Sequence, residues 1–396
     1  MGVVVTLANT IAIGIGATAA DVPTVATELG GALIAQREYT LALYADIPEA
    51  YWQARDFPYL ATVNPPLWEL AHIAWFQEFF ALRWRADDVA GSRTPSCLDV
   101  ADQLFDSRSV AHRTRWQLAY PSRAQCQDYM QRVLDNVVDA LSQSERESRD
   151  GFQLALVHED MHAEALAMTL ATLGLALPDV APKRRRVDES SSSPREIGCV
   201  GGDARVGART GAFAFDNEKP ACTVQLQPFA IDARVVTAAE FAAFVASSAY
   251  RDSRFWSDEG NAWRAAMKNV KAGAPDDFAA MHVNYFEAEA YCRWQNRRLP
   301  TEFEWEHAAT SSDAFLSSTG HVWEWTASAF APYAGFRPER YREYSEPWFD
   351  SHGVLHRVLK GGSFATHPRL RYPQYRNFYT PERNDMFCGF RTCAVA

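Results

Sequence analysis

Apolar residues in the first half of the chain recur with the 3.6-residue period of amphipathic helices. Four stretches show this period, and the connections between them are of modest length. The expected helices cover residues 25–45, 67–85, 123–142 and 151–173. Long helices joined in this way are typical of a four-helix bundle, so the pattern predicts a bundle over residues 25–180.

The pattern changes after residue 199. Short segments in which glycine, aromatic and polar residues alternate replace the helical stripes, and two short helices are expected at residues 237–247 and 284–295. This mixture predicts an α+β domain over residues 199–396. Four consecutive basic residues, four serines and two prolines fall within residues 181–198, which we expect to be an exposed linker with a solvated charge run at residues 183–186.

The first 20 residues contain no charged side chain and include an apolar run at residues 11–15. A secretory signal needs a basic start, but the first Lys or Arg is Arg37, and the run is too short to span a bilayer. We therefore expect residues 1–24 to form a flexible extension, and we expect no membrane partner.

Composition and charge narrow the classes of protein. The chain has 396 residues, of which 47% are hydrophobic, so it can form two domains with full cores. A formal net charge of −10 excludes nucleic acid as a main partner, because phosphate binding needs a basic face. Seven cysteines without a C-x-x-C pair favour a reducing, cytoplasmic location. We expect a monomer or a homodimer.

Histidines on the expected helices form a candidate metal site. His158 and His162 are four residues apart, so both imidazoles project from one helix face. His72 lies among apolar residues of another helix, and a bundle could bring it to the pair. His112 lies in a connection and is a weaker candidate. Three neutral imidazoles suit Fe(II), Zn(II) or Cu(II), and ligand type alone does not choose among them.

The same segment matches the zinc-hydrolase signature H-E-x-x-H, in which Glu159 would be the general base. The extended form of this signature requires Gly and His at positions that are Ala165 and Met168 here. A zinc hydrolase is therefore kept only as a distant alternative to another metal enzyme.

Several motifs of the second half resemble the formylglycine-generating-enzyme (sulfatase-modifying-factor) type of domain, which has a C-type-lectin-like fold. They are FDNEKP (residues 215–220), RLPTEFEWE (298–306), VWEWT (322–326), KGGSF (360–364) and CGFR (388–391). The first half resembles a DinB-like bundle through residues 65–80 and 158–166. In this order the two halves resemble the ergothioneine-biosynthesis sulfoxide synthases and their selenium-using relatives, the selenoneine synthases.

The resemblance implies a mononuclear non-heme Fe(II) centre with O₂ as co-substrate. The positions that match the family's iron ligands are His72, His158 and His162. It also implies that hercynine, a trimethylated histidine betaine, binds the iron through its imidazole and acquires a chalcogen–carbon bond there. Three neutral protein ligands leave coordination positions for both hercynine and O₂, which agrees with this chemistry.

The resemblance further implies substrate contacts and a catalytic tyrosine from the second half. Asn377 would hold the betaine end, and Phe378 would present an aromatic face to the quaternary ammonium. Tyr379 follows them in the same segment. A tyrosine that donates a proton or hydrogen atom is expected at Tyr341 or Tyr344, and we favour Tyr341.

Departures from the family pattern bear on the second substrate. Met161 stands where the sulfur enzymes often have a hercynine-contacting Gln, and Tyr379 where an Asp can hold γ-glutamylcysteine. The loop at residues 107–115 has no clean match to the arginine pair that binds that substrate's carboxylates. Since burying unpaired carboxylates is costly, we predict a less charged donor. The resemblance to the selenoneine synthases implies that this donor is a selenosugar and that the pathway is selenoneine biosynthesis. The alternative is a hercynine sulfoxide synthase that uses γ-glutamylcysteine or cysteine.

Two other classes remain to be weighed. Formylglycine-generating enzymes bind copper through cysteines near the segment that corresponds to residues 363–376, and this segment contains no cysteine. That activity is therefore not expected. A lectin-like binding module with a structural bundle is the non-enzyme alternative, and absence of metal from the purified protein would favour it.

Overall fold

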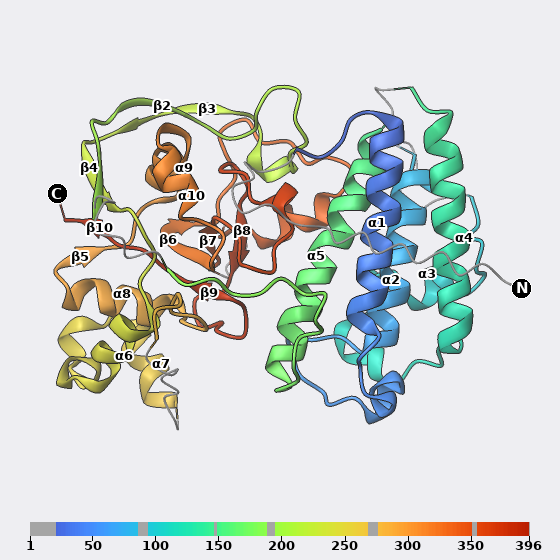
Figure 1. Ribbon diagram of the computed structural model, residues 1–396, viewed down its shortest axis with the longest axis horizontal. Helices are drawn as coiled ribbons and strands as arrows, with labels where there is room; N and C mark the ends of the chain where they lie inside the picture. The colour runs from blue at the N-terminus through green and yellow to red at the C-terminus, as the bar shows by residue number, and fades with distance from the viewer. Residues whose placement is uncertain are drawn as a thin grey trace, which may run out of the picture.

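The computed structural model describes residues 21–85, 94–145, 149–187, 195–267, 276–350 and 355–395. Within these residues the N-terminal half is helical, and the C-terminal half combines short strands and helices. The two halves lie side by side, with helix α5 (Asp150–Thr172) next to the C-terminal half (Figure 1). This division agrees with the α+β class that the sequence predicts.

The N-terminal half contains the four long helices expected from the apolar pattern. They are α1 (Ala26–Tyr44), α2 (Pro66–Glu78), α4 (Arg123–Ser142) and α5, and a short helix α3 (Ala101–Leu104) lies between α2 and α4. Helix α2 continues into a π-helical turn, Phe79–Arg83. Helix α2 packs against α4 and α5, and α1 packs against the same two helices.

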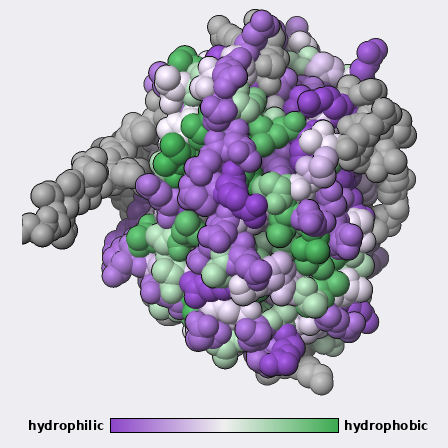
Figure 2. Space-filling model, turned by 90° about the vertical axis from the view of Figure 1, so that its right-hand side faces the viewer, coloured by the Kyte–Doolittle hydropathy of each residue, from purple (hydrophilic) through white to green (hydrophobic). Residues whose placement is uncertain are grey.

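Burial differs sharply between α2 and α4. All thirteen residues of α2 are buried, because neighbouring helices and the connection after it cover every side. Helix α4 buries only one stripe, which includes Tyr129, Val133, Val137 and Leu141, as the sequence predicts. On the face of the bundle that points away from the second half, hydrophilic residues surround separate groups of hydrophobic ones (Figure 2). Because α2, unlike α4, is buried on every side, its polar side chains depend on partners inside the protein.

Within the described residues, the C-terminal half contains two small four-stranded sheets and one hairpin. The first sheet has the order β1 (Glu196–Cys199), β4 (Phe229–Asp232), β10 (Cys393–Ala394), β5 (Arg297–Arg298). The second has the order β8 (Asn377–Tyr379), β7 (Arg357–Lys360), β6 (Trp323–Ala329), β9 (Cys388–Gly389). Strands β2 (Gly202–Val206) and β3 (Cys222–Leu226) form the hairpin.

Five α-helices accompany these strands within the described residues. They are α6 (Ala238–Ala246), α7 (Asp258–Ala266), α8 (Tyr285–Trp294), α9 (Glu302–Ser311) and α10 (Asp313–Ser317). Helices α6 and α8 lie where the sequence predicts short helices. Helices α6, α8 and α9 each begin with a capping box, in which a Thr or Asn side chain and a Glu three residues later satisfy each other's backbone N–H groups.

The motif segments of the C-terminal half meet in buried ion pairs. Lys360 donates to Glu306 over 2.9 Å, and both side chains are completely buried. Arg391 is paired with Glu324, which also accepts a 2.7 Å hydrogen bond from the indole of Trp305. These contacts connect four segments that are distant in sequence, and they explain why charged residues occur inside apolar motifs.

The two halves share a polar interface along α5. Glu164 accepts hydrogen bonds from Trp323 Nε1 at 2.9 Å and from Thr366 Oγ1 at 2.8 Å. Arg369 donates to both carboxylate oxygens of Asp160 at 3.2 Å, and that carboxylate is fully buried. Helix α5 is therefore held by the second half as well as by its own bundle.

The segment between the halves is only partly a free linker. Residues 183–186 are exposed, as expected, but Arg184 donates to the carbonyl of Ala279 and Arg186 pairs with Asp277 at 2.7 Å. Residues 188–194 of the predicted linker and residues 1–20 of the predicted extension lie outside the described residues. None of the helices described here is both long and apolar enough to cross a bilayer.

The buried pair between Lys360 and Glu306 yields a stability prediction. Lys360→Met removes the cation and leaves the Glu306 carboxylate without its partner in a dry core, so we expect a loss of about 3–5 kcal/mol. The measurement is urea unfolding followed by tryptophan fluorescence. Arg254→Met, which removes the solvent-exposed partner of Asp252, is the control and should leave the midpoint unchanged. A loss below about 1 kcal/mol for Lys360→Met would contradict this account.

Candidate metal centre

Three histidines converge between α2 and α5. His72 projects from α2, and His158 and His162 project from one face of α5. One potential ligand nitrogen from each ring lies within 4.8 Å of the other two. His72 and His158 are buried, and His162 is partly exposed. The structure therefore brings together the three histidines singled out in the sequence.

Two of these rings are oriented by hydrogen bonds on their outer nitrogen. His72 Nδ1 lies 2.7 Å from the carbonyl oxygen of Phe105, and His162 Nδ1 lies 2.8 Å from a carboxylate oxygen of Glu69. Metal-binding histidines commonly use their second nitrogen in this way, because the bond fixes the tautomer and the ring orientation. The Nε2 atoms of both rings remain available for a ligand.

The third ring carries an unsatisfied polar atom. His158 Nδ1 is buried without a hydrogen-bond partner among the described residues. A buried polar atom without a partner is uncommon and costs free energy, so its presence here calls for a reason. The three-nitrogen set fits a metal ion, because each ring offers a nitrogen that the protein itself does not use.

The protonation state of the site also suits metal binding. Burial, and secondly the neighbouring imidazole of His162, lowers the pKa of His72 well below its ordinary value. The same two causes lower the pKa of His158. Both rings are therefore neutral at neutral pH, and a metal ion does not have to displace a proton from them.

The His72 ring is held in a stack of flat side chains. Trp68 stacks on it at a centroid distance of 4.7 Å, and Trp75 lies 5.9 Å away on an almost parallel plane. Trp68, His72 and Trp75 are spaced four and three residues apart, so they share one face of α2. The guanidinium groups of Arg115 and Arg108 lie 3.6 Å and 5.3 Å from the Trp68 and Trp75 rings. This stack fixes the plane of the imidazole.

One of the two candidate tyrosines lies beside the histidines. The ring of Tyr341 is 6.1 Å from His158 and 4.8 Å from Phe76, which itself stacks on His158 at 3.4 Å. Burial raises the pKa of Tyr341, so its hydroxyl stays protonated at neutral pH. A protonated phenol from the second half is therefore adjacent to the three-histidine site.

Tyr344 lies on Tyr341 and not directly on the histidines. Its ring lies 5.6 Å from Tyr341, and its hydroxyl is 2.9 Å from that of Tyr375. Its other ring neighbours, Phe215 and Phe378, belong to the second half. Among the described residues it makes no ring contact with the three clustered histidines, so Tyr341 is the nearer of the two candidate tyrosines.

The residues of β8 that were predicted to contact substrate adjoin Tyr344 through Phe378. Phe378 stacks on Phe330 at 4.0 Å, and the Asn377 side chain accepts a hydrogen bond from the Phe378 backbone N–H. Tyr379 is partly buried under the guanidinium of Arg383. Neither aromatic ring of β8 contacts the histidines within the described ranges, so the roles of these residues stay predictions.

Met161 and His112, two further residues singled out in the sequence, have different surroundings. Met161 lies on α5 between the paired histidines and packs, partly buried, against the main hydrophobic core. His112 binds the carbonyl oxygen of Val63 through Nε2 and lies beside Trp116. His112 is therefore not part of the three-histidine cluster.

Glu159 cannot serve the histidines as the H-E-x-x-H signature would require. Both of its oxygens accept hydrogen bonds from Arg37, at 2.8 Å and 3.2 Å, and both side chains are buried. Arg37 also donates to Gln77 and to the carbonyl of Met130. This ion pair lies between α5 and α1, away from the face that carries the histidines. The geometry therefore argues against the zinc-hydrolase alternative.

The sequence reasoning missed two charged residues that shape the site. Glu69 lies three residues before His72 in an apolar helix, and Arg37 lies in the apolar stripe of α1. A charge at a position that the helical pattern predicts to be buried is a usable signal, because such a charge needs a partner. Which partner it has depends on helix packing, which one sequence does not reveal.

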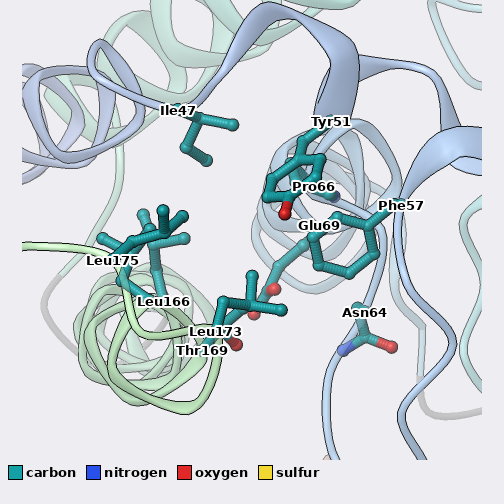
Figure 3. Close-up of a pocket in the computed structure, with 11 residues that line it drawn as sticks. Ile47, Tyr51, Phe57, Asn64, Pro66, Glu69, Leu166, Thr169, Leu173 and Leu175 are labelled. Carbon is teal, nitrogen blue, oxygen red and sulfur yellow. The ribbon is translucent and has the colours of Figure 1, made fainter.

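A narrow and mainly apolar pocket lies next to Glu69. It lies between the start of α2 and the end of α5 and is too narrow to admit a water molecule. Figure 3 shows Leu166 and Leu175 facing Tyr51 and Pro66 across it. Its size makes it a packing gap rather than a substrate site.

Comparison with known proteins assigns both halves to families. Residues 32–166 match the DinB superfamily, and residues 183–319 and 314–396 match the sulfatase-modifying factor enzyme 1-like domain. These matches cover the two regions in which the motifs were found. They define the class as proteins that join a DinB-type helical domain to a sulfatase-modifying-factor domain.

Whole-chain relatives narrow the class further. The chain is 32% identical to a hercynine oxygenase of Mycolicibacterium thermoresistibile, covering 92% of this chain and 94% of that protein. It is 31% identical to a hercynine oxygenase of Mycolicibacterium smegmatis, covering 92% and 97%. A formylglycine-generating enzyme of Streptomyces coelicolor is 29% identical but covers only 51% of this chain. The chain belongs to the hercynine oxygenase family, and it is an enzyme of the oxidoreductase class.

Metal content provides a direct test of the cluster. We expect His72→Ala, His158→Ala and His162→Ala each to lower the metal bound per chain severalfold, because each removes one of three neighbouring nitrogens. The measurement is metal analysis of protein reconstituted with Fe(II) without oxygen. His112→Ala is the matched control and should retain full metal. Unchanged metal content in all three variants would show that the ion binds elsewhere.

The hydrogen bond from His162 to Glu69 leads to a second prediction. Glu69→Gln removes the charged acceptor that orients the ring, so we expect the metal affinity to fall about 10–100-fold. Competition with a chelator measures this affinity. The exposed Glu38 of α1 supplies the control variant Glu38→Gln, which should bind metal normally. Equal affinities in the two variants would remove Glu69 from the orienting role.

Proposed function

We propose that the enzyme is a non-heme Fe(II)- and O₂-dependent oxygenase that joins a chalcogen donor to the imidazole ring of hercynine. The observation that carries this proposal is the convergence of three histidine nitrogens within 4.8 Å, next to a buried tyrosine, in a chain of the hercynine oxygenase family. Neutral imidazoles suit Fe(II) and leave coordination positions for other ligands.

The metal supplies redox chemistry with O₂ and a template that holds substrates together. His72, His158 and His162 would hold it, and Glu69 would orient His162. The rings of Trp75 and Phe76 limit the access of water to the histidines. These residues provide a rigid and largely buried site rather than the oxidising power.

Tyr341 would hold the proton that the reaction needs. A phenol keeps its proton at neutral pH, burial raises the pKa of Tyr341 further, and its ring lies beside His158. Asn377 on β8 and Met161 on α5 would contact hercynine, and Phe378, which stacks on Phe330, would present its ring to the quaternary ammonium. Tyr379 would lie on the side of the second substrate. In this arrangement the bundle holds the metal and the second half provides substrate contacts.

The nature of the donor separates two branches of this function. The relatives are named for hercynine oxygenation, and a relative in Schizosaccharomyces pombe is named for ergothioneine biosynthesis, which supports sulfur as the chalcogen. These names fit the sulfoxide-synthase alternative better than the selenosugar prediction. Selenium remains a second candidate, because Met161 and Tyr379 depart from the sulfur enzymes at positions expected to contact substrate.

The function is tested by reconstituting the protein with Fe(II) without oxygen and then adding O₂, hercynine and one donor at a time. The donors are γ-glutamylcysteine, cysteine, a thiosugar and a selenosugar, and products are identified by mass spectrometry. We expect hercynine-dependent O₂ uptake with at least one donor. No consumption of hercynine with any donor would refute the proposal, whereas peptide hydrolysis with zinc would revive the hydrolase alternative.

The two tyrosines can be separated by kinetics. Tyr341→Phe removes the hydroxyl beside the site, so we expect kcat to fall at least about 100-fold, as for loss of a general acid, with iron content unchanged. Tyr344→Phe removes a hydroxyl that is engaged by Tyr375, and its effect should be less than tenfold. The reverse order would assign the role to Tyr344.

A further inference from the structure

Four tyrosines, Tyr341, Tyr344, Tyr375 and Tyr372, form a series of contacts that begins beside the histidines and is called the tyrosine chain below. Tyr341, whose ring is 6.1 Å from that of His158, stacks on Tyr344 at a centroid distance of 5.6 Å. The hydroxyls of Tyr344 and Tyr375 share a 2.9 Å hydrogen bond. The ring of Tyr375 lies 5.7 Å from that of Tyr372. The tyrosine chain therefore leads, contact by contact, away from the metal centre.

The tyrosine chain ends at a buried carboxylate. The hydroxyl of Tyr372 donates to Oε1 of Glu218 at 2.7 Å, and both side chains are buried. Burial raises the pKa of Glu218 to about 7, so this carboxylate can take up a proton near neutral pH. Its second oxygen, Oε2, has no hydrogen-bond partner among the described residues. Tyr372 is therefore paired with a base, whereas the hydroxyls of Tyr344 and Tyr375 are paired with each other.

This end of the tyrosine chain is also near the surface. The guanidinium of Arg209 lies 5.7 Å from the Tyr372 ring, and the Arg209 side chain is 42% exposed. Trp323, whose ring lies 5.5 Å from that of Tyr375, is buried, and its indole N–H donates to the buried Glu164. One exposed side chain therefore lies between Tyr372 and solvent, whereas Trp323 is enclosed by the core.

The tryptophans that stack on His72 are less suited to losing an electron. The guanidinium of Arg115 lies 3.6 Å from the Trp68 ring, and that of Arg108 lies 5.3 Å from the Trp75 ring. Removal of an electron leaves an indole positively charged, and a neighbouring cation repels that charge. Both arginines therefore oppose oxidation of the indole that they cover.

Trp75 also lacks a good proton acceptor. Its indole N–H donates to Asp102 at 2.7 Å, but this carboxylate is paired with Arg83. Although burial acts to raise it, the hydrogen bonds from Arg83 and Trp75 lower the pKa of Asp102 below its ordinary value. Glu218 takes up a proton more readily, so oxidation with loss of a proton is easier at Tyr372 than at Trp75.

We propose that the tyrosine chain is a relay that carries an oxidising equivalent from the metal centre to Tyr372, and that it protects the centre when O₂ reacts there without a bound donor. Phenol rings can be oxidised inside proteins, whereas phenyl rings cannot, so the tyrosines carry the charge and the phenylalanines packed around them do not. This inference rests on the proposed function, since it needs an oxidant at the three histidines.

Electrons and protons balance along the relay. One electron leaves Tyr372 and one reaches the oxidant that O₂ or peroxide generates at the centre, and each intervening tyrosine gives one electron and regains one. The hydroxyl proton of Tyr372 passes to Glu218, which leaves a neutral tyrosyl radical and a protonated carboxylate. A soluble thiol or ascorbate then supplies one electron, and Glu218 returns the proton.

The relay is tested by detecting the radical rather than turnover. The iron-loaded enzyme, without hercynine or donor, is mixed with hydrogen peroxide, frozen rapidly and studied by electron paramagnetic resonance. We expect a tyrosyl signal, and Tyr372→Phe should remove most of it, because this residue alone in the tyrosine chain donates to a carboxylate among the described contacts. Iron content is measured on the same samples, so a lost signal is not mistaken for lost metal.

Tyr250→Phe is the matched control. Tyr250 is also buried and donates at 2.8 Å to a buried carboxylate, Glu287, whose pKa is likewise raised by burial. Its ring neighbours in the described structure, Phe244 and Trp256, do not belong to the tyrosine chain. Its replacement should therefore leave the radical signal unchanged.

Two further variants keep the relay testable if Tyr372→Phe does not fold. Tyr375→Phe interrupts the tyrosine chain, so oxidation products in residues 341–344, measured by peptide mass spectrometry, should rise severalfold. Glu218→Gln removes the proton acceptor and should lower the yield of the Tyr372 radical severalfold.

Three results would overturn the relay: no tyrosyl signal from the iron-loaded enzyme, a signal unchanged by both Tyr372→Phe and Tyr375→Phe, or an equal loss with Tyr250→Phe. Hercynine and donors are absent from this experiment. Failure to convert hercynine in the reconstitution assay would therefore count against the proposed function, whereas a radical on Tyr372 would still support the relay.

Discussion

The complete burial of α2 is the constraint on which the site depends. No face of this helix meets water, so each of its polar side chains must find a partner inside the protein. Glu69 binds His162, His72 binds the carbonyl of Phe105, and Gln77 binds Arg37. The geometry of the three histidines therefore follows from satisfying polar groups in a core, and a metal ion would enter a site that is already ordered.

Helix α5 links this site to the second half through its two sides. The histidines lie on one face, whereas Asp160 and Glu164 lie on the opposite face and bind Arg369, Trp323 and Thr366. The same helix thus carries the candidate ligands and the interdomain contacts, so the second half helps to fix the position of the ligands.

The spacing of apolar residues predicted the helices of the first half. The contacts between residues that are distant in the sequence could not be predicted in this way. The four helices and the facing of His158 and His162 follow from a 3.6-residue period, which a single sequence displays directly. The position of Tyr341 beside His158 does not, because Tyr341 and Tyr344 lie in one irregular segment and only the packing of the two halves brings Tyr341 to His158. Likewise, the sequence shows Glu159 between two histidines but not that Arg37, 122 residues earlier, binds it.

The stack around His72 also has an optical consequence. Trp68 and Trp75 enclose this imidazole on both sides at centroid distances of 4.7 Å and 5.9 Å. Indole emission is quenched efficiently by an ion with unpaired electrons at such short range. If such an ion binds His72, we expect the fluorescence of these two of the twelve tryptophans to fall. Occupancy of the centre could then be followed in solution without an added label.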